Sequence, residues 1–194
     1  EYDGLAASPR VLATRGILNR MQPADERAAD TGLILLGGPS KRHSWNDEHL
    51  CEQICTLVAR ESEMRWTLAT SRRTPGSSVQ RLERIPSVRI VPFGAVGADW
   101  LPQQLQRSAF AWVSEDSVSM IFEALTAGNP TGLLAVPRRS AKRDRVIAAI
   151  DKLRDDQMVV LFEDWAAGRT LVGAPEPLDE AGRCAAWVLA RLGH

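Results

Sequence analysis

GLILLGGPSKRHSWNDEHLCEQICTLVARESEMRWTLATS, residues 32–71, alternates between two kinds of hydrophobic pattern. It begins with a short apolar run that ends in glycines, and it closes with a second such run, RWTLATS. Between them, Leu50, Ile54 and Leu57 recur at helical spacing after Asn46, a good N-cap residue. The stretch therefore predicts a βαβ unit with two buried parallel strands.

The same alternation continues to the end of the chain. Strands and helices of this kind predict an α/β fold, a Rossmann-like doubly wound parallel sheet of about six strands with helices on both faces. The further strands are expected at residues 87–93, 109–114, 130–136 and 158–162. The further helices are expected at residues 77–85, 98–108, 117–128, 140–156 and 179–193.

Composition narrows the class of protein. The chain has 194 residues, of which 44% are hydrophobic, which suits one well-buried domain. Its 24 basic and 24 acidic side chains give zero net charge, which argues against a nucleic-acid binder. No apolar run approaches the roughly 20 residues of a membrane span, and no signal peptide is visible. We expect a cytoplasmic protein, with attachment to the periphery of the inner membrane as an alternative.

The cysteines suggest neither disulfides nor a metal site. Cys51 and Cys55 share a helix face, but no second pair of ligands completes a zinc site, and Cys184 is far away in the sequence. We expect buried free thiols and no metal.

The first thirty residues differ from the rest. Residues 11–21 predict a short strand, a glycine turn and a helical turn, and residues 22–30 are polar and linker-like. We interpret residues 1–30 as the tail of a preceding domain plus a linker, with a disordered leader as the alternative. Residues 31–194 then form the Rossmann-like nucleotide-binding domain. The last helix, 179–192, is expected to pack on the preceding domain, and its apolar face also favours a dimer.

The loop after the first expected strand is a candidate anion site. In such sheets ligands bind beyond the carboxyl ends of the strands, where the strand order reverses. Gly37 and Gly38 allow close backbone approach, and Ser40, Lys41 and Arg42 precede a helix N-terminus that favours an anion. The alternative is an ordinary turn with solvated basic residues. Neither a P-loop nor the G-x-G-x-x-G fingerprint is present, so a common NAD or ATP enzyme is not expected.

The next two loops add arginines and an aromatic ring. Arg72 and Arg73 follow a strand directly, and a guanidinium binds phosphate oxygens in a fork, so either side chain is a candidate diphosphate ligand. Phe93, beside Gly94, is a candidate rim for a flat base. Two exposed arginines without a ligand are the alternative.

The fourth loop opens a helix with hydroxyl groups. Asp116 or Ser117 is expected to cap this helix, and the hydroxyls of Ser117 and Ser119 are candidates for binding an anion. Glu123 follows Ser119 by four residues, so the two share a helix face, and its carboxylate is placed to accept hydrogen bonds from two ribose hydroxyls. The alternative is a capped helix with a solvated Glu123.

These motifs together resemble a known family. EDSVSMIFEALTAGNPTGLL, residues 115–134, is similar to the S-x-x-E-A…G-x-P element of GT-B glycosyltransferases, whose glutamate holds the ribose of a nucleotide sugar. With LLGGPSKRHSW, TSRRTP and the opening EYDGL…VLATRGILNR, the chain resembles the mitochondrial-fission (elongated mitochondria) family. Its bacterial members are described as GT-B glycosyltransferases. The similarity covers nearly the whole chain.

The resemblance implies that the chain is the C-terminal, nucleotide-sugar-binding half of a GT-B protein. It implies transfer of a glycosyl group from a nucleotide-diphosphate sugar without a metal or other cofactor, which agrees with the lack of an Asp-x-Asp motif. The acceptor, its pocket and the general base belong to the N-terminal half, so no catalytic residue is assigned and the chain alone is expected to be inactive. Tyr2 replaces the usual histidine, which argues against a role for that side chain. The residues that match the donor site are Gly37, Gly38, Ser40, Arg72, Arg73, Asp116, Ser117, Ser119 and Glu123.

Two other functions stay open. A non-catalytic adaptor of the mitochondrial-fission type would keep the fold and bind partners through helix faces such as residues 142–154. A non-hydrolysing sugar-nucleotide epimerase shares the architecture, but it needs acidic and histidine cleft residues that this half does not offer. His43 is interpreted as a surface histidine and not as a catalytic group.

Overall fold

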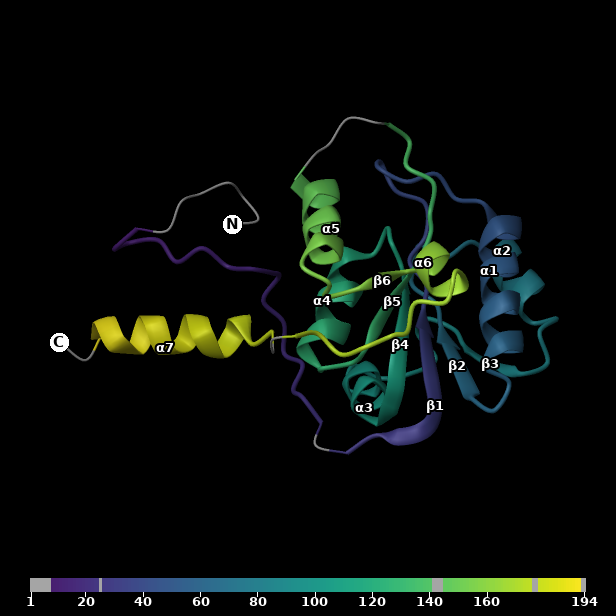
Figure 1. The fold of residues 1–194 in the computed structure, drawn as a ribbon, viewed down its shortest axis with the longest axis horizontal. Coiled ribbons are helices and arrows are strands. Elements are labelled where there is room, and N and C mark those ends of the chain that lie inside the picture. The colour runs from purple at the N-terminus through teal and green to yellow at the C-terminus, as the bar shows by residue number, and fades with distance from the viewer. Residues whose placement is uncertain (1–7, 25, 141–144, 176–177, 193–194) are drawn as a thin grey trace.

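The described part of the chain contains a single parallel sheet. The computed structural model describes residues 8–24, 26–140, 145–175 and 178–192. Within them, six strands pair in parallel in the order β3-β2-β1-β4-β5-β6 (Figure 1). This is the order of doubly wound nucleotide-binding domains, so the predicted Rossmann-like fold is confirmed. The strands are β1 (Ala28–Leu35), β2 (Arg65–Ala69), β3 (Val88–Val91), β4 (Ser108–Ser114), β5 (Thr131–Leu134) and β6 (Val160–Leu161).

Helices cover both faces of the sheet. One core joins the sheet to α1 (Asp47–Arg60), α2 (Gly76–Leu82) and α6 (Phe162–Ala166). The other joins it to α3 (Trp100–Arg107), α4 (Val118–Thr126) and α5 (Arg145–Asp155). Successive strand residues point to opposite faces, so Leu33 and Leu35 of β1 belong to the second core, whereas Ile34 and Leu36 belong to the first. All four side chains are fully buried.

Local signals explain where α1 and α3 begin. The Asn46 side chain accepts hydrogen bonds from the backbone N–H groups of Glu48 and His49, as expected for the N-cap of α1. Pro102 lies in the first turn of α3, where its missing N–H has no helical partner to lose. The sequence did not predict α6, which follows the two residues of β6 directly.

Two strand glycines make room for tryptophans. Gly32 of β1 is paired with Trp66 of β2, and Gly132 of β5 is paired with Trp112 of β4. A Cβ on Gly132 would lie 2.5 Å from an atom of the Trp112 ring, and one on Gly32 would meet the Trp66 ring just as closely. Each indole therefore lies flat over the neighbouring strand, which only glycine permits.

The segment before the sheet differs from its prediction. Residues 8–24, which we call the strap, contain only an isolated bridge between Ser8 and Val11, so the strand and helical turn expected over residues 11–21 are wrong. β1 also begins inside the expected linker. Arg27 attaches the start of β1 to the helices: its guanidinium donates to the carbonyls of Leu105 (2.6 Å) and Ala127, at the ends of α3 and α4.

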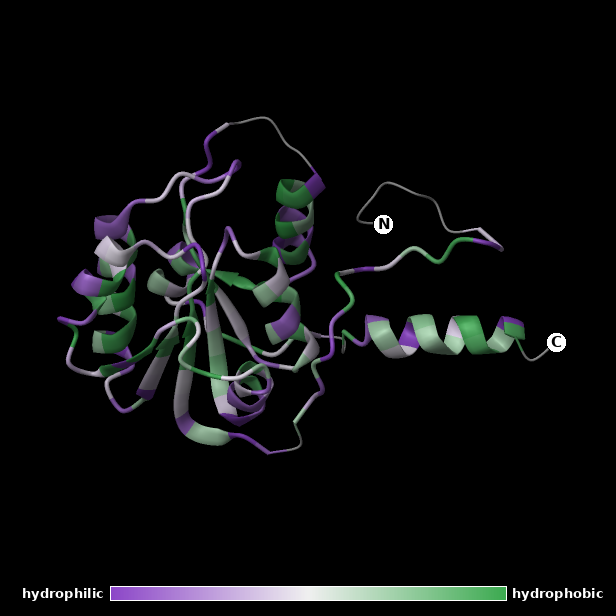
Figure 2. Ribbon diagram, turned by 180° about the vertical axis from the view of Figure 1, so that it is seen from behind, coloured by the Kyte–Doolittle hydropathy of each residue, from purple (hydrophilic) through white to green (hydrophobic). Residues whose placement is uncertain are grey.

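The last helix, α7 (Glu180–Leu192), stands apart from the sheet with the first part of the strap beside it (Figure 1). Glu180 is 2% exposed; its carboxylate accepts from the Arg15 backbone N–H at 2.8 Å and pairs with Arg183 at 2.5 Å. Beyond these contacts α7 carries hydrophobic residues away from both cores (Figure 2). Leu189 and Leu192 are 67% and 75% exposed. We call α7 and residues 8–15 the arm. Its packing on a preceding domain stays a prediction.

Two further expectations concern the cysteines and the membrane. Cys51, Cys55 and Cys184, all within the described ranges, are free thiols. Their predicted burial is wrong, because Cys55 is exposed and the other two are half-buried. Among the described residues, no helix is long and apolar enough to cross a membrane.

Candidate ligand site at the carboxyl ends of the strands

The strand order reverses between β1 and β4, and the loops that follow these two strands are in contact. Gly37 N–H donates to Ser114 Oγ at 2.8 Å, and Gly38 N–H donates to Asp116 Oδ2 at 2.9 Å. Ser114 Oγ in turn donates to Asp116 Oδ1 at 2.7 Å. A Cβ on Gly37 would overlap the Asp116 carboxylate, so this close approach requires glycine. The two glycines thus lie at the switch point, as predicted.

An ion pair ties a third loop to this contact. Arg73 Nη1 lies 2.7 Å from Asp116 Oδ2 and donates to the Gly38 carbonyl at 2.5 Å. The Asp116 side chain is fully buried, whereas that of Arg73 is 41% exposed. Gly38 is also required here, because a Cβ would overlap the carbonyl oxygen of Arg73. We call Gly37, Gly38, Arg73, Ser114 and Asp116 the loop lock.

The loop lock corrects one expectation, the cap of α4. The Asp116 carboxylate does not cap α4. Ser117 occupies the N-cap position, but its side chain accepts no capping hydrogen bond from a described backbone N–H. The N–H groups of Gly37 and Gly38 donate to the protein's own oxygens, so the close backbone approach that these glycines allow is made by the loop after β4. Arg73 likewise pairs with an internal carboxylate. These groups shape the site, and other side chains provide its accessible charge.

Hydroxyl groups of the second loop strengthen the junction. Ser71 Oγ donates to the Gly37 carbonyl at 2.8 Å, and Thr74 Oγ1 donates to the same carbonyl at 2.6 Å. Thr74 Oγ1 also accepts from the Ser71 backbone N–H at 2.8 Å. The hydroxyl-rich turn after β2 therefore fixes the loop after β1.

Arg72 and Phe93 form an exposed pair at the same edge of the sheet. The Arg72 guanidinium carbon lies 5.7 Å from the centre of the Phe93 ring, within cation–π range. Phe93 is 58% exposed, and its backbone N–H donates to Thr70 Oγ1 at 2.9 Å. No described residue accepts a hydrogen bond from Arg72 or pairs with it. Its donors are therefore directed to solvent beside an open aromatic surface.

A fifth loop, after β5, joins the site and was missed by sequence reasoning. Ser40 Oγ accepts from the backbone N–H groups of Arg42 (3.1 Å) and His43 (3.0 Å), which bends the first loop. Arg139 then donates to the carbonyls of Ser40 (3.0 Å) and His43 (3.2 Å). Exposed Lys41 and Arg42 consequently lie near Arg139. The only sequence signal was the pair of arginines that follows β5.

His43 is not the surface residue that the sequence suggested. Its side chain is 1% exposed, because the loop after β5 covers it and forms an isolated bridge between His43 and Arg138.

Glu115 is a second residue that sequence reasoning passed over. It directly follows β4, where burial raises the pKa of its carboxyl above the ordinary value, although the Val136 N–H and the charge of Arg138 act in the opposite direction. Glu115 Oε2 accepts from that N–H at 3.3 Å, and Arg138 pairs with Asp151 at 2.9 Å. A carboxyl whose pKa is raised by burial thus lies at the end of a central strand.

The helix α4 carries the remaining predicted residues. Ser117 is buried, Ser119 is exposed, and Glu123 is half-buried on the same face as Ser119. Burial raises the pKa of Glu123, while the nearby charge of Arg20 lowers it. No described residue donates a hydrogen bond to its carboxylate.

The strap passes close to this part of α4. The side-chain amide of Asn19 donates to the Phe122 carbonyl at 3.3 Å and to Thr126 Oγ1 at 3.0 Å. Glu123 therefore lies beside the strap and outside the loop lock, and its contact with a ribose stays a prediction.

The site shows no protein-built metal centre. Among the described residues, no three His, Cys, Asp or Glu side chains gather closely enough to hold a metal ion.

Fold and site together define a doubly wound α/β domain with a polar, arginine-rich edge at its switch point. The sequence model of the mitochondrial fission ELM1 family matches residues 1–192. The chain therefore belongs to this family, which confirms the resemblance seen in its motifs.

Other comparisons add little. No curated protein matches the chain significantly. One solved structure with a similar fold is the FMN-dependent cysteine decarboxylase TvaF from thioviridamide biosynthesis. It is 13% identical, with a TM-score of 0.49, and the match covers 71% of this chain and 91% of that one. Nothing about a ligand follows from a likeness at this level.

Proposed function

We propose that the chain binds a nucleotide-diphosphate sugar at the carboxyl ends of β1, β2, β3 and β4, as the donor half of a GT-B-type glycosyltransferase. The observation that carries this proposal is the exposed Arg72–Phe93 pair beside the loop lock. A guanidinium with uncommitted donors suits a diphosphate, and an exposed ring beside it suits a nucleobase.

In glycosyl transfer, the task of the donor half is to stabilise the negative charge of the leaving group. When the bond between the anomeric carbon and the diphosphate oxygen breaks, negative charge grows on the departing nucleoside diphosphate. In this proposal Arg72 and Lys41 stabilise that charge, while the acceptor oxygen forms the new bond and loses its proton to a base outside this domain. In this proposal Glu123 accepts hydrogen bonds from the ribose, and family membership supports that assignment.

Calorimetric titration with UDP, GDP, CMP and ADP tests the proposal. One nucleotide should bind, and Arg72→Ala and Glu123→Gln should each weaken it at least tenfold. Arg89→Ala on β3 and Glu83→Gln after α2 are the matched controls, because both residues are exposed outside the candidate site, and they should bind like the parent chain. A folded chain that binds none of the four nucleotides would overturn the donor-site assignment.

The second candidate is a non-catalytic adaptor that retains the fold. Two observations favour it: the loop-lock amides are occupied by internal oxygens, and the arm exposes Leu189 and Leu192. An adaptor or dimer contact through the arm predicts that Leu189→Asp abolishes self-association in sedimentation experiments. In that case neither the parent chain nor the Leu189→Asp variant should bind a nucleotide.

A further inference from the structure

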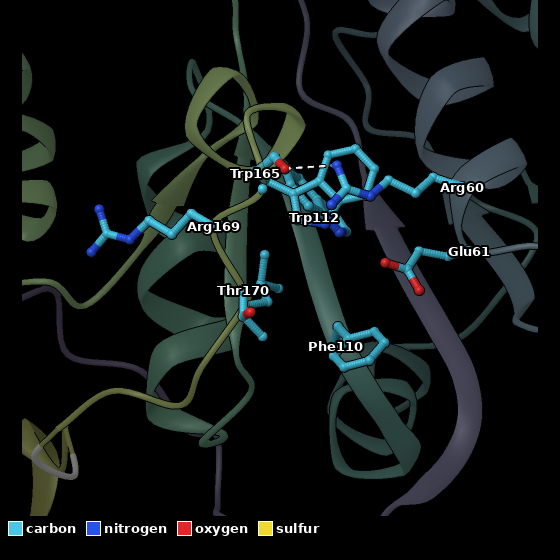
Figure 3. A pocket seen from close by; sticks show the side chains of 9 residues that line it. Arg60, Glu61, Phe110, Trp112, Trp165, Arg169 and Thr170 are labelled. Carbon is cyan, nitrogen blue, oxygen red and sulfur yellow. Dashed lines mark hydrogen bonds between the residues drawn. The ribbon is translucent and has the colours of Figure 1, made fainter.

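A separate cavity of about 240 Å³ lies on the α1, α2 and α6 side of the sheet (Figure 3). It lies between the last residues of α1 and the segment that follows α6, over the first half of β4. The candidate ligand site, by contrast, follows the last residue of β4. The lining residues are Arg60, Glu61, Phe110, Trp112, Trp165, Gly168, Arg169, Thr170 and Leu171.

Local backbone geometry builds one wall of this cavity. Gly168 has φ of +110°, a conformation that favours glycine, and it ends α6 with hydrogen bonds from Gly168 N–H to the Trp165 carbonyl and from Arg169 N–H to the Asp164 carbonyl. The chain then reverses, so that Thr170 and Leu171 face β4 across the cavity.

Three aromatic side chains, Phe110, Trp112 and Trp165, line part of the cavity, among polar and charged groups. Trp112 and Trp165 meet edge to face, with ring centres 5.3 Å apart at 74°, and both are almost fully buried. Phe110 precedes Trp112 by two residues on β4, so both rings face the same side of the sheet. The face of an aromatic ring is negative and attracts cations.

Both arginines of the lining make contacts within the chain. The Arg60 guanidinium lies 4.5 Å from the centre of the Trp165 ring and donates to the carbonyls of Trp165 (2.9 Å) and Ala166 (3.2 Å). The Arg169 guanidinium points away from the cavity (Figure 3). Its Nη1 lies 3.7 Å from the Asp164 carboxylate. Arg60 Nη1 is thus occupied by two carbonyls, and Arg169 directs its donors away from the space.

Glu61 is the charged group that faces the cavity. Its carboxylate points toward the space between Phe110 and Thr170 (Figure 3). No described residue pairs with this carboxylate or donates a hydrogen bond to it. Aromatic walls with one unpaired carboxylate are complementary to a positive charge on a small apolar body.

We propose that this cavity binds a small organic cation of the alkylammonium class, with its charge near Glu61 and its alkyl groups against Phe110 and Trp112. The cavity is slightly smaller than the roughly 300 Å³ at which ligand pockets begin, so it suits a compact group. Arg60 over Trp165 shows that these aromatic residues already hold one cation. The proposal is independent of nucleotide binding at the carboxyl ends of the strands.

Choline and its neutral isostere 3,3-dimethylbutan-1-ol are the probes that test this proposal. Choline should change the fluorescence of the buried tryptophans and release measurable heat, and the neutral isostere should bind at least tenfold more weakly. Glu61→Gln should weaken choline binding at least tenfold, whereas Glu63→Gln, two residues further on and exposed, should leave it unchanged. Thr170→Trp, at an exposed lining position, should block binding by filling the cavity.

The opposite results are equally clear. A folded chain that does not bind choline, or that binds the neutral isostere equally well, would overturn the assignment. Binding of benzoate in place of choline would show that the arginines, and not Glu61, determine the preference.

Discussion

The carboxyl-end site and the aromatic cavity lie on the same strand but are built in different ways. At the end of β4, short polar side chains and glycines of three loops hold one another by hydrogen bonds and a buried ion pair. Earlier along β4, Phe110 and Trp112 face the C-terminal ends of α1 and α6. There side-chain packing determines the shape of the cavity.

The difference shows where a parallel sheet places its chemistry. Every strand delivers its following loop to the same edge, so polar residues from distant parts of the sequence meet there. Helix ends and a returning segment form the cavity, and their positions depend on how α1 and α6 pack. Substitutions at the carboxyl-end site should therefore break polar contacts between loops, whereas substitutions at the cavity should disturb the packing of α1 and α6.

The largest effect is expected from Gly37→Ala. The new Cβ would overlap the Asp116 carboxylate, forcing apart the loop lock and its ion pair with Arg73. We expect a loss of about 3 kcal/mol in the free energy of unfolding, because overpacking and a disrupted buried charge both contribute. Urea denaturation measures it.

Gly76→Ala is the matched control, since no heavy atom lies within 4 Å of the added Cβ and its φ is not in the left-handed region. It should be neutral or stabilising at the start of α2. Equal free energies of unfolding for the two variants would show that the loop lock accommodates the added Cβ without loss of stability.

A smaller effect is expected on the aromatic side from Arg60→Ala. The variant loses a cation–π contact and two hydrogen bonds to carbonyls at the end of α6. We expect a loss of about 1–2 kcal/mol, together with a changed tryptophan emission. Arg84→Ala, at an exposed position after α2, should change neither property. An unchanged thermal midpoint in Arg60→Ala would mean that packing alone holds α6.

The smallest effect concerns the pH dependence of stability near Glu115. Burial raises the pKa of this carboxyl above 4.5 in the folded chain, so the folded protein keeps a proton that the unfolded chain releases. Stability should therefore fall as pH rises from about 4.5 through the raised pKa. Glu115→Gln removes this fall and should gain stability over the parent chain at pH 7 but not at pH 4. Thermal melts across this range, with Glu83→Gln as control, measure it; parallel curves for parent and variant would contradict the buried-carboxyl account.

The sequence was a good guide to the sheet and a poor one to its surroundings. Continuous apolar runs such as 32–36 predict strands, because both faces of a parallel sheet are buried. The expected strand and helical turn in residues 11–21 did not form, since contacts with α4 and α7 determine the path of the strap. The short helix α6 was missed, because five residues carry too little periodicity to be recognised.

The predicted site shows the same limit. Residue types and order placed Gly37, Arg72 and Asp116 at one edge, as the structure confirms. The pattern did not show that Asp116 would turn toward Gly38 and Arg73 and leave the helix cap. It also could not show Arg139 beside Ser40, because that contact joins loops 99 residues apart.

The sequence by itself determined the class of fold, the family and the edge of the sheet that gathers polar loops. These follow from hydrophobic periodicity and chain order, which are local properties read along the sequence. Only the tertiary structure decided which polar groups are consumed in holding loops together, and that Phe110, Trp112 and Glu61 line one cavity. Partner choice depends on distances between residues remote in sequence, and those distances are fixed only when the whole sheet and its helices pack.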